Sequence, residues 1–186
     1  AQSIIDGVTD VFISYESIIV LEDDLITTPN FLDFMNQALK TYYLKNNLMS
    51  INGFSIDVGQ DNMSEKKDVF FHNRTLSWGW ATWKDRWSKE MFDIDKIKSE
   101  INDKTLFAFR QKCGDDISRM LLDSLSGRND SWYVRWAFRH FLEKKLALFP
   151  CYSKIKNIGY GEHATHSKTI DVLKNCQDNE CLQVFN

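Results

Sequence analysis

The chain has 186 residues, of which 43% are hydrophobic and 13% aromatic, and its formal net charge at pH 7 is −3. This composition fits a globular domain with a substantial core and excludes a largely disordered chain. The slightly acidic balance gives no electrostatic reason to expect nucleic acid as a partner, and no apolar run approaches the roughly 20 residues that span a bilayer.

The first half of the chain alternates helix-like and strand-like patterns. It predicts a helix over 1–12, a strand over 17–21, a helix over 29–44 and a strand over 48–54. The first strand is a continuous aliphatic run, which is typical of a strand buried on both faces. Thr28 and Pro29 form a helix start, because a hydroxyl that caps the helix is followed by proline at the first helical position.

The second half continues the alternation. It predicts a short apolar run at 68–71, helices over 93–112, 115–126 and 131–145, and a strand over 146–149. Gly127 is a typical C-terminal helix stop, and Pro150 ends the last strand. Strands that alternate with helices favour an α/β fold.

A triplet of carboxylates, Glu22, Asp23 and Asp24, comes directly after the first predicted strand. In open α/β sheets, ligands bind at the carboxyl ends of the strands. Grouped carboxylates suit a hard divalent cation, which binds one or two of them and completes its shell with water and substrate phosphates. The triplet therefore predicts a metal and a phosphate-bearing substrate. The alternative interpretation is a solvated turn that caps the following helix.

Four tryptophans lie within ten residues, at positions 78, 80, 83 and 87. Gly79 between Trp78 and Trp80 indicates a loop where the backbone approaches a ligand closely, and aromatic faces pack well on sugar rings. These three residues are candidates for substrate binding. Trp83 and Trp87, four apart, are expected to form a core stripe at the start of a helix.

Three blocks of sequence, "IIVLEDDLITTPNFLDFM", "SWGWATWKDRW" and "KNIGYGEHATHS", together resemble the GT-A glycosyltransferases related to N-acetylglucosaminyltransferase I. They are also similar to bacterial family-2-like enzymes of surface polysaccharide synthesis. The resemblance covers residues 11 to about 168. It implies a GT-A-like mixed sheet flanked by helices, with a catalytic domain over 1–168 and a polar tail over 169–186.

The resemblance implies a metal-dependent, inverting glycosyltransferase. It would move a sugar from a nucleotide-diphosphate donor, with a UDP-sugar favoured, to a glycan or lipid-linked acceptor. Asp24 would bind Mn²⁺ or Mg²⁺, and His166 would complete the metal shell. Glu22 and Asp23 would contact the metal through water, or bind the sugar and ribose of the donor.

An inverting transfer also needs a carboxylate that takes the proton from the attacking hydroxyl. The resemblance assigns this role to Asp130, just before a tryptophan at a helix N-terminus. The competing role for Asp130 is to cap the helix that starts at Ser131, and a helix N-terminus would also make it a weaker base. Asp115 and Asp116 are fallback bases, again with helix capping as the alternative.

Enzymes of this fold begin with a βαβ segment that holds the nucleotide base, and nothing like it precedes Ile18. We therefore expect an incomplete GT-A domain, whose unprotected sheet edges favour homo-oligomers. The expected location is cytoplasmic, with peripheral attachment at the inner face of the membrane as a variant. Two other functions stay open: a non-catalytic glycan- or protein-binding domain of the same fold, and a metal-dependent phosphoesterase.

Overall fold

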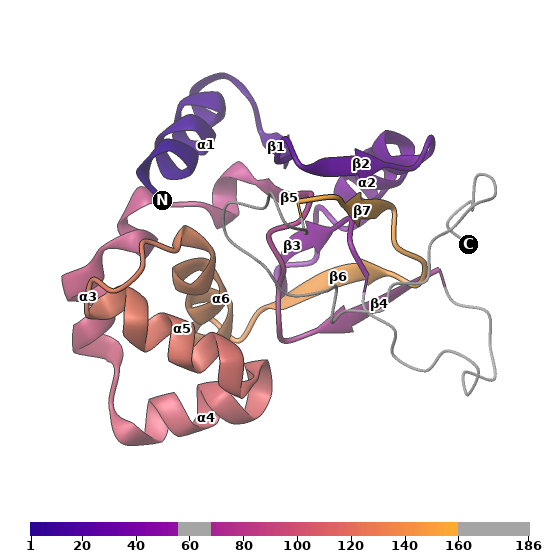
Figure 1. Cartoon of the computed structure of the whole chain (residues 1–186). Coiled ribbons are helices and arrows are strands. Elements are labelled where there is room, and N and C mark those ends of the chain that lie inside the picture. The colour runs from indigo at the N-terminus through magenta and orange to yellow at the C-terminus, as the bar shows by residue number, and fades with distance from the viewer. Residues whose placement is uncertain (56–67, 160–186) are drawn as a thin grey trace.

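The computed structural model describes residues 1–55 and 68–159. They form a mixed α/β domain with one five-stranded sheet and one two-stranded sheet (Figure 1). The larger sheet contains β1 (Ser17–Val20), β3 (Leu48–Asn52), β4 (Val69–His72), β5 (Trp80–Trp83) and β6 (Leu146–Pro150), and the smaller one pairs β2 (Leu25–Thr27) with β7 (Ile155–Asn157). The helices are α1 (Gln2–Ser14), α2 (Phe31–Thr41), α3 (Ile94–Glu100), α4 (Asp103–Cys113), α5 (Asp115–Leu125) and α6 (Trp132–Leu142), with short 3-10 helices η2 (Lys84–Arg86) and η3 (Lys89–Phe92).

The larger sheet has the strand order β1-β5-β3-β6-β4. Only β3 and β6 are parallel neighbours, so β1, β3 and β6 run in one direction while β4 and β5 run in the other. The carboxyl ends of β1 and β3 therefore meet the amino end of β5, and both Val20 and Asn52 lie opposite Trp80. We call this edge of the sheet the carboxyl edge.

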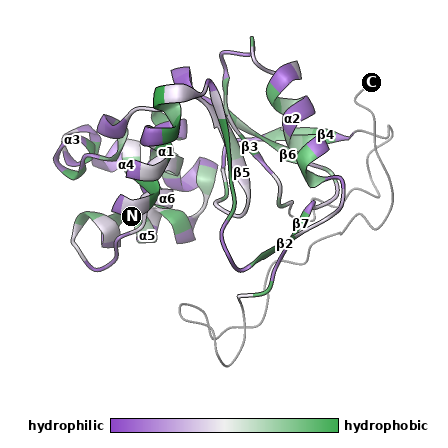
Figure 2. Ribbon diagram, turned by 90° about the horizontal axis from the view of Figure 1, so that it is seen from above, coloured by the Kyte–Doolittle hydropathy of each residue, from purple (hydrophilic) through white to green (hydrophobic). Residues whose placement is uncertain are grey.

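Helices cover both faces of the sheet. Figure 2 shows α2 on one side and α1 with α3–α6 on the other. Residues of β3 serve both faces, because Leu48 and Ile51 belong to the core under α2 while Met49 belongs to the core on the side of α1 and α6, and the register of β3 shifts between Leu48 and Ser50. Strand β5 does the same, with Trp83 in the α2 core and Trp80 in the opposite core. A third apolar cluster joins α3, α4, α5 and α6 to one another.

The predicted helices over 1–12, 29–44, 115–126 and 131–145 are confirmed as α1, α2, α5 and α6, with bounds that differ by a few residues. Helix α2 begins at Phe31 rather than at Pro29, because Thr28 and Asn30 form a turn in which Thr28 Oγ1 lies 2.8 Å from Asn30 Oδ1. The predicted helix over 93–112 is two helices. The first, α3, ends at Glu100, and Asn102 caps the second, since its side chain accepts a hydrogen bond from Thr105 N–H at 3.0 Å.

Some strand predictions need correction. β1 is a half-buried edge strand, so the prediction of a strand buried on both faces is wrong. Trp83 and Trp87 belong to the core, as predicted, but Trp83 ends a strand and Trp87 follows a 3-10 helix, so no α-helix starts there. Strands β2 and β7 have three residues each, too few for a periodic signal.

A buried polar chain crosses the interior between α6 and β3. His140 Nδ1 lies 3.0 Å from the carbonyl oxygen of Trp136, and Nε2 lies 2.8 Å from Ser50 Oγ. Because a carbonyl only accepts, Nδ1 carries the proton and Nε2 accepts from the serine hydroxyl. Burial lowers the pKa of His140 to about 4, so the ring is neutral at physiological pH.

The buried histidine makes stability depend on pH. In the unfolded chain His140 takes up a proton near its ordinary pKa of 6.5, whereas in the folded chain it does so only near 4, so stability falls as the pH is lowered through this interval. Between about pH 7.5 and about pH 5 this group should cost about 2 kcal/mol of unfolding free energy. Urea unfolding of the wild type and of His140→Gln at both pH values measures the effect as the change in their difference.

The comparison of two variants cancels other titrating groups, including Glu22, whose raised pKa acts in the opposite sense. An equal loss of stability in both proteins on acidification would show that His140 is not its source.

Candidate functional site

The carboxylate triplet lies at the carboxyl edge. Glu22 follows β1, and Asp23 and Asp24 form the turn that leads into β2. The alternative interpretation was a turn that caps the following helix. The turn is present, but it does not cap a helix, because the next element is strand β2 and α2 begins only at Phe31. The turn is thus held between two strands that belong to different sheets.

The triplet is electrostatically unfavourable. Burial, followed by the charges of Asp24 and Asp23, raises the pKa of Glu22 to about 7. None of the ion pairs in the described part of the chain involves these three carboxylates. In the folded chain Glu22 is therefore partly protonated near neutral pH, and a cation beside the turn would favour its ionised form.

Asp24 has an unusual environment. Its Oδ1 is buried and has no hydrogen-bond partner among residues 1–55 and 68–159. A buried acceptor without a donor costs free energy, and the cost is larger for a charged group. A divalent cation with a preference for oxygen ligands fits this atom.

The fit is that of an ion with few protein ligands. Within the described residues no three His, Cys, Asp or Glu side chains are arranged to hold a metal by themselves. Mg²⁺ is usually held by one or two carboxylates together with water and substrate phosphates. His166, the second predicted metal ligand, lies outside the described residues, as does the predicted domain boundary at 168.

The beginning of the third resembling block lies against the triplet. Ile158 N–H donates to the carbonyl oxygen of Asp24 at 2.9 Å. Gly159 packs so closely on the Asp24 carboxylate that a Cβ at this position would overlap it. The Asn157 side chain accepts a hydrogen bond from Gly159 N–H at 2.7 Å, which fixes this close approach. The contact between Gly159 and Asp24 was not predicted from the sequence.

The tryptophan block meets the same edge. Gly79 has a φ of +57°, and a Cβ there would overlap the side chain of Ile155. Its carbonyl oxygen accepts a hydrogen bond from Gly53 N–H at 2.6 Å. The close approach that this glycine permits is therefore to Ile155, and its contact with a ligand stays a prediction. Trp78 is half-buried and meets Phe54 edge to face, with 4.7 Å between the ring centroids.

Trp80 has a different role from Trp78. Its side chain is 0% exposed, and its ring packs with those of Trp87, Trp132 and Trp136 at centroid distances of 5.8, 5.1 and 5.9 Å. A ring enclosed in this way offers no face to a sugar. We assign Trp80 to the core and keep Trp78 as the aromatic candidate for substrate binding.

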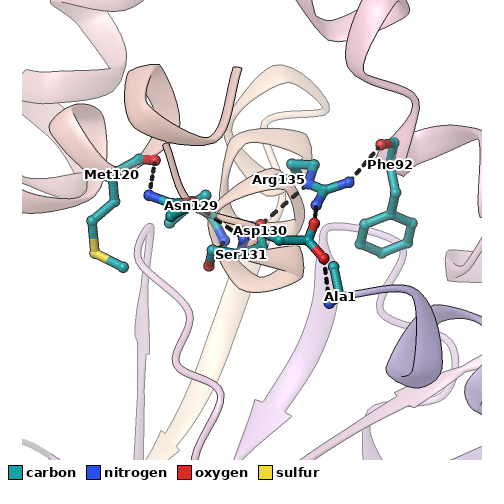
Figure 3. A network of polar contacts seen from close by, with 8 residues as sticks. Ala1, Phe92, Met120, Asn129, Asp130, Ser131 and Arg135 are labelled. Atoms are coloured by element: carbon teal, nitrogen blue, oxygen red, sulfur yellow. Dashed lines mark hydrogen bonds and ion pairs between the residues drawn. The ribbon is translucent and has the colours of Figure 1, made fainter. Parts of the chain in front are cut away.

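Asp130 takes part in a polar network at the start of α6 (Figure 3). Its Oδ2 lies 2.8 Å from the amino group of Ala1, and its Oδ1 lies 2.5 Å from Arg135 Nη2. Arg135 is buried and also donates to the carbonyl oxygens of Phe92 and Ser131, each at 3.2 Å. The amino group of Ala1, then Arg135, lowers the pKa of Asp130.

In this network Asp130 forms ion pairs rather than capping α6. Ser131 is the cap of α6, since its Oγ accepts from Val134 N–H at 3.5 Å, so the capping alternative for Asp130 is wrong. The Asp130 side chain is 71% exposed and ionised, and a lowered pKa makes it a weaker base. Its partner was missed in the sequence, although Arg135 and Arg139, four apart in an apolar helix, are a signal of buried ion pairing.

The fallback bases lie elsewhere. Asp116 forms a two-pronged ion pair with Arg74 at 2.8 and 3.1 Å, which lowers its pKa against the effect of burial. Arg74 follows the end of β4, and β4 runs opposite to β1. Asp116 is therefore tied to the opposite edge of the sheet from the triplet. Asp115, its neighbour, pairs with Arg110.

No protein-family model matches the chain, and no curated protein is significantly similar to it. In the part of the chain that the structure describes, no helix is both long and apolar enough to cross a membrane.

The packing on Gly79 can be tested by substitution. Gly79→Ala should lower the unfolding free energy by about 2 kcal/mol, because alanine is strained at this φ and its methyl group meets Ile155. Gly7→Ala is the control, since this residue of α1 has nothing within 4 Å of the added atom and alanine should stabilise the helix by about 0.5–1 kcal/mol. Chemical denaturation of both variants measures whether the unfolding free energy falls with Gly79→Ala and rises with Gly7→Ala. A neutral Gly79→Ala would contradict the observed packing.

Proposed function

We propose that the chain is the metal- and sugar-binding part of a GT-A-type, inverting glycosyltransferase that uses a nucleotide-diphosphate sugar. One observation carries the proposal. Three segments far apart in sequence, 21–24, 78–80 and 155–159, come together at the carboxyl edge of one sheet. Each overlaps one of the three blocks that resemble these transferases, and ligands of open α/β sheets bind at this edge.

In this proposal the triplet binds the donor through Mn²⁺ or Mg²⁺. The metal neutralises the carboxylates and acts as a Lewis acid toward the diphosphate leaving group. Asp24 holds it through the buried oxygen that has no other partner within the described residues, and His166 completes the shell. Glu22 and Asp23 bind the water ligands of the metal, or the sugar and ribose of the donor.

Asp130 is the proposed base for the acceptor hydroxyl. Arg135 keeps its carboxylate ionised at neutral pH, and its exposed position leaves it accessible to an incoming acceptor. Trp132, two residues further on, packs against Trp80, which connects the start of α6 with the carboxyl edge. Trp78 is proposed to pack on the sugar ring.

The remaining expectations belong to the same proposal. The donor is a UDP-sugar, the acceptor is a glycan or lipid-linked glycan, and the reaction serves bacterial surface polysaccharide synthesis in the cytoplasm or at the inner face of the membrane. The chain is proposed to form homo-oligomers.

Thermal unfolding with a panel of nucleotide sugars tests the donor site. A UDP-sugar with Mn²⁺ at about 100 times the dissociation constant should add about 2.7 kcal/mol of stability. A chelator should abolish the shift, and so should Asp24→Asn, because the metal then loses its charged ligand. Asp10→Asn, an equal charge change on the exposed side of α1, should keep it.

Two outcomes would count against this donor site. A shift that persists in chelator would favour the non-catalytic binding domain, and the absence of a shift with every nucleotide sugar would contradict donor binding by this chain.

The base can be tested separately from the donor site. Asp130→Asn should lower the transfer rate by about 10²–10⁴-fold, because the amide cannot take the proton of the acceptor. The nucleotide-dependent thermal shift should be unchanged. Asp115→Asn, the matched substitution at a fallback position, should leave the rate unchanged, and a selective loss with this variant instead would move the role of base to Asp115.

A further inference from the structure

The segment 73–79, which we call the crossover segment, carries Trp78 and Gly79 to the candidate site. It leaves β4 at the edge opposite the triplet and enters β5 at the carboxyl edge, and none of its residues is helical or in a strand. The segment therefore has no ladder of backbone hydrogen bonds to fix its course. Side chains from other elements must do so.

Helix α6 holds the middle of the crossover segment from one side. Tyr133 O–H donates to the carbonyl oxygen of Thr75 at 2.8 Å. Burial raises the pKa of Tyr133 to about 12, so the hydroxyl keeps the proton that it donates. Thr75 is fully buried, and its carbonyl would lose this donor if the hydroxyl were removed.

Strand β3 holds the segment from the other side. The buried Asn52 accepts a hydrogen bond from Leu76 N–H at 2.9 Å and donates to the carbonyl oxygen of Leu148 at 3.3 Å. Thr75 Oγ1 lies 3.0 Å from Ser50 Oγ, the hydroxyl that also contacts His140. Thr75 and Leu76 are thus held between α6 and β3. Thr75 lies three residues before Trp78 and Leu76 two residues before it.

We infer that Tyr133 and Asn52 are positioning residues that set the place of Trp78 and Gly79 at the carboxyl edge. They do so through Thr75 and Leu76, because only Ser77 separates Leu76 from Trp78. That this positioning affects substrate binding rests on the proposed function. The positioning itself is a property of the chain without ligand. Helix α6 then contributes both to the placement of Trp78 and, through its first turn, to that of Asp130.

The test uses ¹⁹F NMR of the full chain labelled with 5-fluorotryptophan. The chain has six tryptophans, and the resonance of Trp78 is assigned by its disappearance in Trp78→Phe. Tyr133→Phe removes a single hydroxyl and should shift or split the Trp78 resonance in the folded protein. Asn52→Ala should also shift the Trp78 resonance, because it removes the contact between β3 and Leu76. If Asn52→Ala does not fold, the result with Tyr133→Phe decides the test.

Ser131→Ala is the matched control. It removes the cap of the same helix and therefore lowers stability, but it does not touch the crossover segment. Its Trp78 resonance should stay in place, while that of the adjacent Trp132 reports the local change. A Trp78 resonance that is unchanged in Tyr133→Phe, or that moves equally in Ser131→Ala, would overturn the inference. No ligand is needed, so a failed donor-binding experiment leaves this result independent.

Discussion

The carboxyl edge depends on close contacts between backbones that larger residues would prevent. Gly53 and Gly79 share a short hydrogen bond, the side chain of Ile155 packs on Gly79, and Gly159 packs on the carboxylate of Asp24. These contacts bring the ends of β1 and β3, the start of β5 and the exit of β7 to one place. Everything proposed for the site follows from this convergence, because none of the four segments is adjacent to another in sequence.

The same convergence sets the electrostatics. The turn after β1 gathers three carboxylates, and burial, followed by the repulsion of Asp24 and Asp23, raises the pKa of Glu22. At the start of α6 the opposite arrangement holds, since the Ala1 amino group and the buried Arg135 lower the pKa of Asp130. One acidic group is thus set against ionisation and the other is kept ionised. Environments that separate the pKa values of two carboxyl groups are a common feature of sites that handle charge.

Sequence patterns predicted the helices that have a clear apolar spacing or a clear cap. Helix α2 was found because its apolar residues repeat at three and four, and α6 because its periodicity begins after a serine cap. Strand β5 was missed because Gly79 was interpreted as part of a loop, and Trp83 and Trp87, four apart, as the start of a helix. The prediction of one helix over 93–112 missed the break between α3 and α4. The spacing of apolar residues does not reveal that the Asn102 side chain caps a new helix.

The candidate site was predictable in its residues but not in its contacts. The triplet and the tryptophan block stand out from the sequence, because clustered charge and clustered indoles both need a reason. Which tryptophan faces the core depends on strand register, and the register that sets Trp80 opposite Val20 is decided by pairing across 60 residues. The partner of Asp130 and the approach of Gly159 to Asp24 likewise arise only from tertiary packing.

Strand β5 has a consequence for how the domain comes apart. Within four residues it sends Trp80 into one core and Trp83 into the other, and both indoles are buried. Loosening the layer formed by α1 and α6 exposes Trp80 and displaces the backbone that also anchors Trp83 beneath α2. We therefore expect the two layers to unfold as one cooperative unit, because opening either face of the sheet disturbs a strand that also anchors the other.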